Sequence, residues 1–300
     1  MRTYLSIFIL AVLSTSCTGL VNTFAFHPDT ENFYPDEKMP PNTNQVFITT
    51  TDGIKLESYF LSNPLSDRVL IYFHGNAGNI SHRIPDLARI RQFGINVLGV
   101  GYRGYGRSEG NASENGIYID GKSALRYAID TLGFPQDKII IMGRSIGSTV
   151  AMNTSGGEPI AGMILVSPLT TAKDQAKAGG LWIISPLAGD AFNNVGKAKH
   201  LLCPVLILHG TEDEIIPLGM GKTLFNSIPS EKQFIEISGA GHNNLTSEEY
   251  QEKYWSPIEQ FIQSKGTNDK LNVRGERIPI ESLQATALLH SENALILRFR

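Results

Sequence analysis

Short, continuous apolar runs rich in valine and isoleucine recur through the middle of this 300-residue chain. Runs of this kind are typical of parallel strands buried on both faces of a sheet, because a strand with one solvated face alternates apolar and polar residues. Five such runs occur, and a sixth, at 234–237, alternates more. The five lie at 69–73, 95–100, 139–142, 163–166 and 205–208. We therefore predict a largely parallel sheet.

Segments with helical spacing of apolar residues lie between these runs, and such alternation is typical of an α/β fold. The clearest is 117–132, for which Ser113 or Asn115 is a candidate N-cap. Further helices are predicted at 146–154, 218–228 and 248–263.

A β-hairpin is predicted ahead of the first buried run. Segments 45–51 and 54–61 flank Asp52-Gly53, a favoured hairpin turn, so we expect them to pair antiparallel. Together with the six runs they predict an α/β architecture with a mostly parallel eight-stranded sheet, helices on both faces and at most a small cap. The length suits one such domain, which we place at 45–266.

Two segments fall outside these patterns. Segment 167–200 fits no strand and contains apolar residues such as Trp182 and Ile183. It is interpreted either as a small cap over a site or as a surface crossover with its own apolar face. The helical and strand patterns stop after Lys265, so residues 267–300 are assigned to a C-terminal tail of unknown role.

The N-terminus carries features of an export signal. Arg2 precedes an apolar run at 4–13 that is too short to cross a bilayer, which needs about 20 residues, and small residues follow at 14–16. Cys17 after these small residues resembles a bacterial lipoprotein signal, although Ser14 stands where leucine is typical. We predict a signal at 1–17 with Cys17 as a candidate lipidation site, and a linker at 18–44. The alternative is an uncleaved N-terminal anchor.

This signal predicts a protein exported from the cytoplasm, either periplasmic or lipid-anchored to a bacterial membrane. Membrane attachment would run through the N-terminus. The net charge of −3 gives no reason to expect a nucleic-acid partner. Two cysteines, Cys17 and Cys203, exclude a disulfide framework. Because the histidines and carboxylates show no ligand-like spacing, neither a metal nor another cofactor is predicted, and the oligomeric state stays open.

Two matches to nucleotide-binding motifs are interpreted as chance. Residues 99–104 match the dinucleotide fingerprint, but a glycine-rich loop follows at 105–110 where that motif needs a helix. Residues 116–123 match the phosphate-binding P-loop, but they begin a predicted amphipathic helix instead of following a strand.

The motif that carries chemistry is GRSIG at 143–147, which fits the G-x-S-x-G nucleophile elbow. A predicted strand precedes it and a predicted helix follows, as the elbow requires. The sharp turn strains the backbone of Ser145, and Gly143 and Gly147 relieve the crowding that results. We predict Ser145 as the nucleophile and the backbone N–H of Ile146 as one oxyanion donor.

A serine hydroxyl needs a base, and histidine suits that task at neutral pH. With this elbow the chain order is serine, then acid, then histidine, and four histidines follow Ser145. His242 is selected because it comes directly after the last predicted strand. His200 precedes a strand, His209 ends one and is expected to support the next loop, and His290 lies in the tail.

The acid that orients the imidazole is expected after the strand at 205–208. Asp213 is favoured there, with Glu212 and Glu214 as rivals that spacing alone does not eliminate. The second oxyanion donor is expected in the loop at 74–79, whose glycines allow close approach to a ligand. Asn76 is the candidate donor, and His74 is expected to be structural.

Five blocks then resemble a known family: HGNAGN (74–79), GYRGYGRSEG (101–110), GRSIGS (143–148), HGTEDEIIP (209–217) and GAGHNN (239–244). Residues 45–265 resemble the alpha/beta hydrolase superfamily, and within it the Bem46-like branch of serine hydrolases, which includes bacterial hydrolases and eukaryotic protein depalmitoylases. The resemblance implies the alpha/beta-hydrolase fold. It also implies that Asp213 is the triad acid and that Asn76 contributes to the oxyanion hole.

The predicted function is a two-step acyl transfer on an ester or thioester of a small-molecule or acylated substrate, through Ser145, His242 and Asp213. One alternative is a peptidase or amidase with the same triad. Another is a non-catalytic surface lipoprotein that keeps the fold as a binding module.

Overall fold

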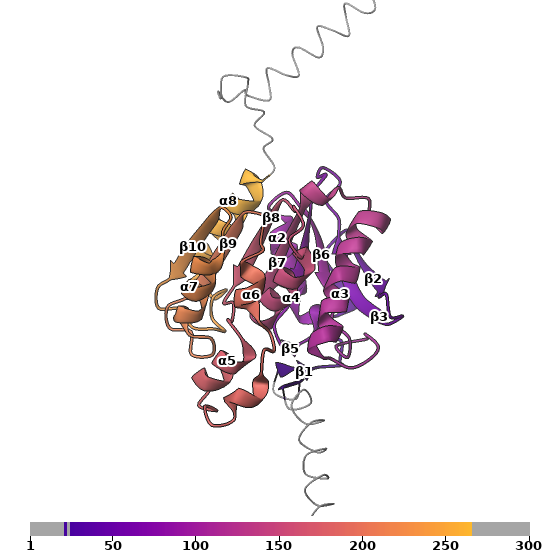
Figure 1. Ribbon diagram of the computed structural model, residues 1–300. Coiled ribbons are helices and arrows are strands. Elements are labelled where there is room, and N and C mark those ends of the chain that lie inside the picture. Colours follow the sequence, from indigo (N-terminus) through magenta and orange to yellow (C-terminus); the bar gives the residue numbers. More distant parts are fainter. Residues whose placement is uncertain (1–20, 23–24, 266–300) are drawn as a thin grey trace, which may run out of the picture. The chain divides into compact units, whose positions relative to one another are not determined.

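A computed structural model describes residues 21–22 and 25–265. Its centre is an eight-stranded sheet with the strand order β10-β9-β8-β7-β4-β6-β3-β2 (Figure 1). The run from β6 to β10 is parallel, whereas β3 pairs antiparallel with both β6 and β2. The strands are β2 (Thr43–Thr49), β3 (Lys55–Leu61), β4 (Val69–Phe73), β6 (Asn96–Val100), β7 (Ile139–Arg144), β8 (Gly162–Val166), β9 (Val205–Gly210) and β10 (Lys232–Ile237). The predicted mostly parallel, eight-stranded sheet is confirmed.

The continuous apolar runs are buried on both faces, as their composition predicted. Every residue of β4, β6, β8 and β9 is buried. In β4, Val69 and Ile71 join the hydrophobic core on one face, and Leu70 and Tyr72 join the core on the other. The edge strand β10 is only partly buried, which explains its more alternating sequence.

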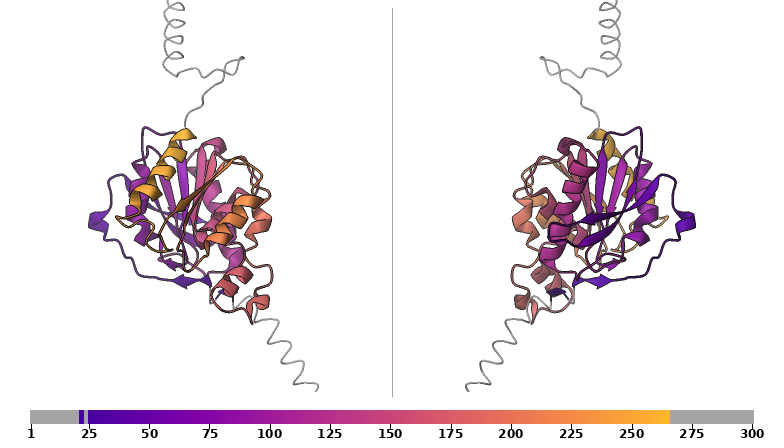
Figure 2. Two further views of the ribbon diagram at one scale, coloured as in Figure 1. Left: turned by 90° about the vertical axis from the view of Figure 1, so that its left-hand side faces the viewer. Right: turned by 90° about the vertical axis from the view of Figure 1, so that its right-hand side faces the viewer.

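Helices cover both faces of the sheet (Figure 2). One core contains residues of α3 (Glu114–Arg126), α4 (Ile146–Ser155), α6 (Asn194–Ala198) and α7 (Leu218–Ser227), and the other contains residues of α2 (Ile84–Arg91) and α8 (Gln251–Ser264). The helix predicted at 117–132 begins three residues earlier than expected. Ser113, one of the two candidate caps, accepts a hydrogen bond from the amide of Gly116.

Both nucleotide-binding matches lie in structures that cannot serve those motifs. Residues 99–104 run from β6 into a loop, and α3 begins only at Glu114. Residues 116–123 lie inside α3, where a Cβ on Gly121 would overlap Thr154 and Val150 of α4. Gly121 therefore serves helix packing.

Segment 167–200 contains α5 (Ala172–Ala178), the 3-10 turn η5 (Ser185–Ala188) and α6. We call residues 172–192 the cap. Figure 1 shows α5 at the same end of the sheet as β1 (His27–Pro28) and β5 (Ala77–Gly78), a short parallel pair formed by the N-terminal segment and the loop after β4.

The predicted signal at 1–17, with Cys17, and the tail at 267–300 lie outside the described residues. They stay predictions from the sequence. Within 21–22 and 25–265, no helix combines the length and apolar character needed to cross a bilayer.

Candidate active site

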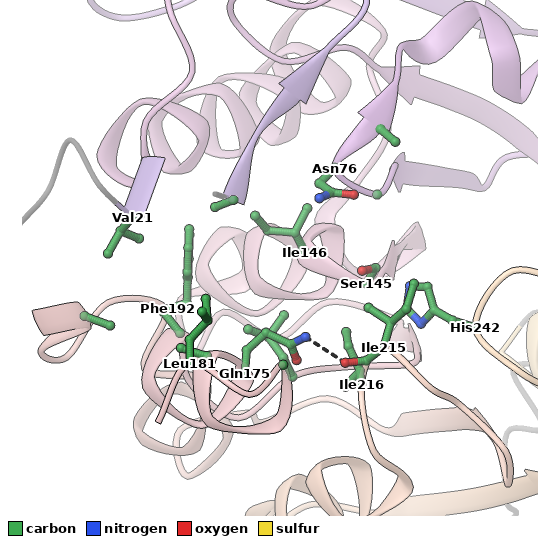
Figure 3. Close-up of a pocket in the computed structure, with 18 of the residues that line it drawn as sticks. Val21, Asn76, Ser145, Ile146, Gln175, Leu181, Phe192, Ile215, Ile216 and His242 are labelled. Carbon is green, nitrogen blue, oxygen red and sulfur yellow. Dashed lines mark hydrogen bonds between the residues drawn. The ribbon is translucent and has the colours of Figure 1, made fainter. Parts of the chain in front are cut away.

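The parallel strands deliver the predicted site residues to one edge of the sheet. Asn76 follows β4, Ser145 lies between β7 and α4, and His242 follows β10. These three, together with Ile146, line a single pocket (Figure 3). Asp213, after β9, joins the group through His242: its Oδ2 lies 2.8 Å from the ring Nδ1.

Ser145 occupies a strained turn between β7 and α4. Its φ of 54° and ψ of −124° are rarely adopted by a residue with a side chain. A Cβ on Gly143 would overlap the backbone of Gly147, and a Cβ on Gly147 would overlap the carbonyl of Phe73 in β4. The two glycines therefore relieve crowding within the turn and also against the neighbouring strand.

Hydrogen bonds hold Asp213 in its ionised form. Its Oδ1 accepts from the amides of Ile215, at 3.0 Å, and Ile216, at 2.7 Å. Burial alone would raise the pKa of the Asp213 carboxyl, but the interactions with His209, with His242 and with the Ile216 amide outweigh burial and hold the pKa well below its usual range. An anion thus faces His242 at neutral pH.

The ring and the backbone of His242 are both fixed. A carboxylate only accepts hydrogen bonds, so Nδ1 carries the hydrogen and Nε2 is left as the proton acceptor. The amide of His242 donates to Glu214 Oε2 at 3.1 Å, and its carbonyl accepts from Arg144 Nη2 at 3.0 Å. Sequence reasoning missed both supports: Arg144 is a variable position of the elbow motif, and Glu214 was only a rival acid.

The rival residues take other places. Glu212 is exposed, whereas Asp213 is buried against the His242 ring. His209 is fully buried, and its Nε2 donates to the carbonyl of Ile216 at 2.8 Å, so it supports the loop that carries Asp213. His200 is exposed just before β9, and His290 lies outside the described residues.

The two predicted oxyanion amides remain available. In the described part of the chain, no group accepts a hydrogen bond from the backbone N–H of Asn76 or Ile146. The His74 ring is buried, and its Nδ1 donates to the Gly75 carbonyl at 2.6 Å. This carbonyl belongs to the peptide that carries the Asn76 N–H. His74, expected only to be structural, therefore orients a candidate oxyanion donor.

The pocket has a volume of about 490 Å³, and its wall is largely apolar. The cap supplies much of this wall, which favours the cap interpretation of segment 167–200 over a plain surface crossover. Gln175 Nε2 in α5 donates to the carbonyl of Ile215 at 2.7 Å and so connects the cap to the loop of Asp213 (Figure 3). The apolar lining residues are Val21, Ala25, Ala77, Ile146, Leu169, Ala172, Ala176, Leu181, Ile184, Leu187, Ala188, Phe192, Ile215 and Ile216.

The described residues contain no group of three or more histidine, cysteine, aspartate or glutamate side chains arranged to hold a metal ion. The polar groups around the pocket are instead arranged for proton transfer and for anion stabilisation: an imidazole with one free nitrogen, a carboxylate behind it, and two backbone amides near a serine.

Comparison with known proteins places these observations in context. A family model described as "Serine aminopeptidase, S33" matches residues 65–196. The protein bem46 of Schizosaccharomyces pombe is 32% identical over 253 residues, which cover 79% of this chain and 82% of that protein. The human alpha/beta hydrolase domain-containing protein 17B is 30% identical over 239 residues, covering 75% and 77% of the two chains.

Solved structures share the fold at lower sequence identity. An esterase from Pyrococcus furiosus superposes with a TM-score of 0.67 at 19% identity, covering 80% of this chain and 98% of the esterase. Acetyl xylan esterase 1 from Thermoanaerobacterium gives a TM-score of 0.62 at 15% identity, covering 85% and 94%. The alpha/beta-hydrolase fold expected from the sequence is confirmed.

The buried His74 predicts a specific pH dependence of stability. Burial, with the nearby charge of Arg83, lowers the pKa of His74 from 6.5 to about 3. Between these two pH values His74 is neutral in the folded protein and protonated in the unfolded chain. The contribution of His74 to the free energy of unfolding is therefore fully present above about pH 6.5. It falls as the pH drops toward 3, by up to about 1.4 kcal/mol per pH unit. The change His74→Asn should flatten that slope, as measured by denaturant unfolding between about pH 7 and pH 5.

The exposed His200 supplies the control, because His200→Asn removes a histidine without touching the pocket. The pH dependence of its free energy of unfolding should match that of the unmodified protein. If all three proteins showed the same pH dependence, the lowered pKa of His74 would be contradicted.

Proposed function

The chain belongs to the alpha/beta hydrolase superfamily, and we propose that it is a serine hydrolase that cleaves carboxylic ester or thioester bonds through an acyl-enzyme. The observation that carries this proposal is the 2.8 Å hydrogen bond between Asp213 and a histidine that lines the same pocket as the strained Ser145. Similarity to bem46 and to protein 17B supports placing the chain in the Bem46-like branch that the sequence blocks resemble.

In the proposed reaction, His242 Nε2 takes the hydroxyl proton of Ser145 as the serine oxygen attacks the substrate carbonyl. The Asp213 carboxylate stabilises the imidazolium that forms. The amides of Ile146 and Asn76 donate to the oxyanion of the tetrahedral intermediate. His242 then protonates the leaving group, an acyl-enzyme remains, and a water deprotonated by His242 attacks it to release the acid and free Ser145.

A peptidase is the second candidate, because the matching family model is described as a serine aminopeptidase. An aminopeptidase must bind the ammonium group of a peptide N-terminus, for which a carboxylate is the natural partner. Among the described residues that line the pocket there is no aspartate or glutamate, while Arg83 and Arg144 are both present. This charge pattern and the apolar wall favour an ester or thioester of an apolar acyl chain over a peptide with a free N-terminus.

The triad is tested by three substitutions. Because Ser145 forms the covalent bond, Ser145→Ala should abolish labelling by a fluorophosphonate probe and lower kcat/KM on p-nitrophenyl esters by at least about 10³-fold. Asp213→Asn should cost about 10³- to 10⁴-fold, because it loses the anion behind His242. The neighbouring, exposed Glu212→Gln is the matched control and should stay near the original rate. A wild-type protein that neither reacts nor labels would point to the binding-module alternative.

The pocket predicts a preference for longer acyl chains. With p-nitrophenyl esters of increasing length, kcat/KM should rise by up to about fourfold per methylene, because each buried CH₂ contributes about 0.8 kcal/mol. Ala176→Phe should shift the preference toward shorter chains by filling the pocket, whereas Ala178→Phe, on the same helix but exposed and outside the pocket, should not. Faster turnover of aminoacyl p-nitroanilides than of esters would favour the peptidase.

We further propose that the protein is exported and attached to a membrane through its N-terminus, through Cys17 or through the apolar run at 4–13. Cell fractionation should recover it with membranes, and labelling with a radioactive fatty acid should be lost in Cys17→Ser if Cys17 is the anchor. Recovery of the full-length, unlabelled protein from the cytosol would overturn this proposal.

A further inference from the structure

Large apolar side chains are exposed at the tip of the cap. Trp182 and Ile183 are 68% and 73% exposed, and Leu181, Ile184 and Leu187 beside them are also exposed. We call these five residues the apolar rim. They make up five of the ten large hydrophobic side chains that are exposed in the described part of the chain. Exposed apolar side chains gathered in this way mark interaction surfaces.

The apolar rim is continuous with the pocket. Leu181, Ile184 and Leu187 line the pocket as well as being exposed, while Trp182 and Ile183 lie outside it. An apolar surface therefore runs from the wall of the pocket to the outer tip of the cap. An acyl chain that enters the pocket can stay in contact with apolar side chains along this path.

The sequence of the rim favours lipid over a folded protein partner. No charged residue occurs between Ala178 and Gly189, a stretch of 12 residues. Protein interfaces surround their apolar centre with polar, hydrogen-bonding side chains, whereas apolar side chains that enter a bilayer need no such polar surround. The apolar rim, with no charged residue in its stretch of sequence, has the composition expected of a bilayer contact.

The described part of the N-terminal segment lies against the pocket and the cap, and the predicted anchor precedes it by only a few residues. Val21 lines the pocket, and Phe26 packs edge-on against Phe192 of the cap with ring centroids 6.2 Å apart. Cys17 precedes Val21 by four residues, which span at most about 14 Å, and the apolar run ends eight residues before Val21, at most about 28 Å. Either form of the anchor would hold the bilayer within a short tether of the pocket.

We propose that the apolar rim docks the protein on a lipid bilayer, with Trp182 and Ile183 inserted among the acyl chains and the pocket opening toward the membrane. The proposal goes beyond the hydrolase function because docking requires no catalysis. It adds to the N-terminal anchor a second contact, which fixes the orientation of the domain on the membrane.

Fluorescence tests this orientation directly. The chain has two tryptophans, and Trp255 is only 8% exposed, so quenching by brominated phosphatidylcholine vesicles reports on Trp182. The full-length protein carrying Ser145→Ala is used, so that the result does not depend on the hydrolase proposal. We expect strong quenching, and we expect Trp182→Ser combined with Ile183→Ser to lower the vesicle partition coefficient by about tenfold or more.

The matched control combines Leu65→Ser with Leu202→Ser, which removes two exposed leucines, 98% and 65% accessible, that lie outside the cap. Its partition and quenching should equal those of the parent protein, and thermal unfolding checks that all variants fold. Vesicle-bound protein with unquenched Trp182 would overturn the proposal, since the anchor alone would then hold it. The proposal would also be overturned if the protein did not bind vesicles. It would be overturned as well if the protein self-associated without lipid and the Trp182→Ser, Ile183→Ser variant did not, since the rim would then contact a second copy of the chain.

Discussion

The register of the parallel strands is the constraint on which the site depends. Phe73 of β4 pairs with Gly143 of β7, and the amide of Ser145 donates to Val166 of β8 at 2.8 Å, so the elbow begins where its neighbours end. Gly147 then lies so close to the carbonyl of Phe73 that no side chain fits. A shift of one residue would move Ser145 away from the loop that carries Asn76 and reverse the faces of the buried strand residues.

The loops at this edge are joined to one another as well as to the strands. Arg144 reaches the carbonyl of His242, Glu214 accepts from the amide of His242, and His74 holds the peptide that precedes Asn76. In the block at 101–110, Tyr102 and Tyr105 donate to the carbonyls of His74 and Asn76, at 2.8 Å each. This block contains no proposed catalytic residue, yet it supports the loop that carries Asn76. That support is a physical reason for the block's place in the resemblance.

Strands and helices with a regular pattern of apolar residues could be predicted from the sequence. Short helices and side chains whose roles depend on contacts with distant parts of the chain could not. Buried strands such as β4 and β9 are continuous apolar runs rich in valine, leucine and isoleucine, so their positions were predicted closely. Helices α2, α5 and α6 were not predicted, because each is short and its stability depends on packing more than on its own spacing. Arg144 and Gln175 were missed for a similar reason: each acts by reaching a backbone carbonyl far away in the sequence, which leaves no local pattern.

The proposed reacting groups and the apolar wall of the pocket come from different parts of the chain. Strand ends hold the proposed reacting groups, whose arrangement would suit any acyl transfer, whereas the cap between β8 and β9 shapes the volume in front of them. Gln175 couples the two parts, because it donates to Ile215, whose own amide donates to Asp213. A displacement of α5 would therefore reach the carboxylate behind His242 through two hydrogen bonds. The cap, which forms much of the pocket wall, is thus connected by hydrogen bonds to the carboxylate that faces His242.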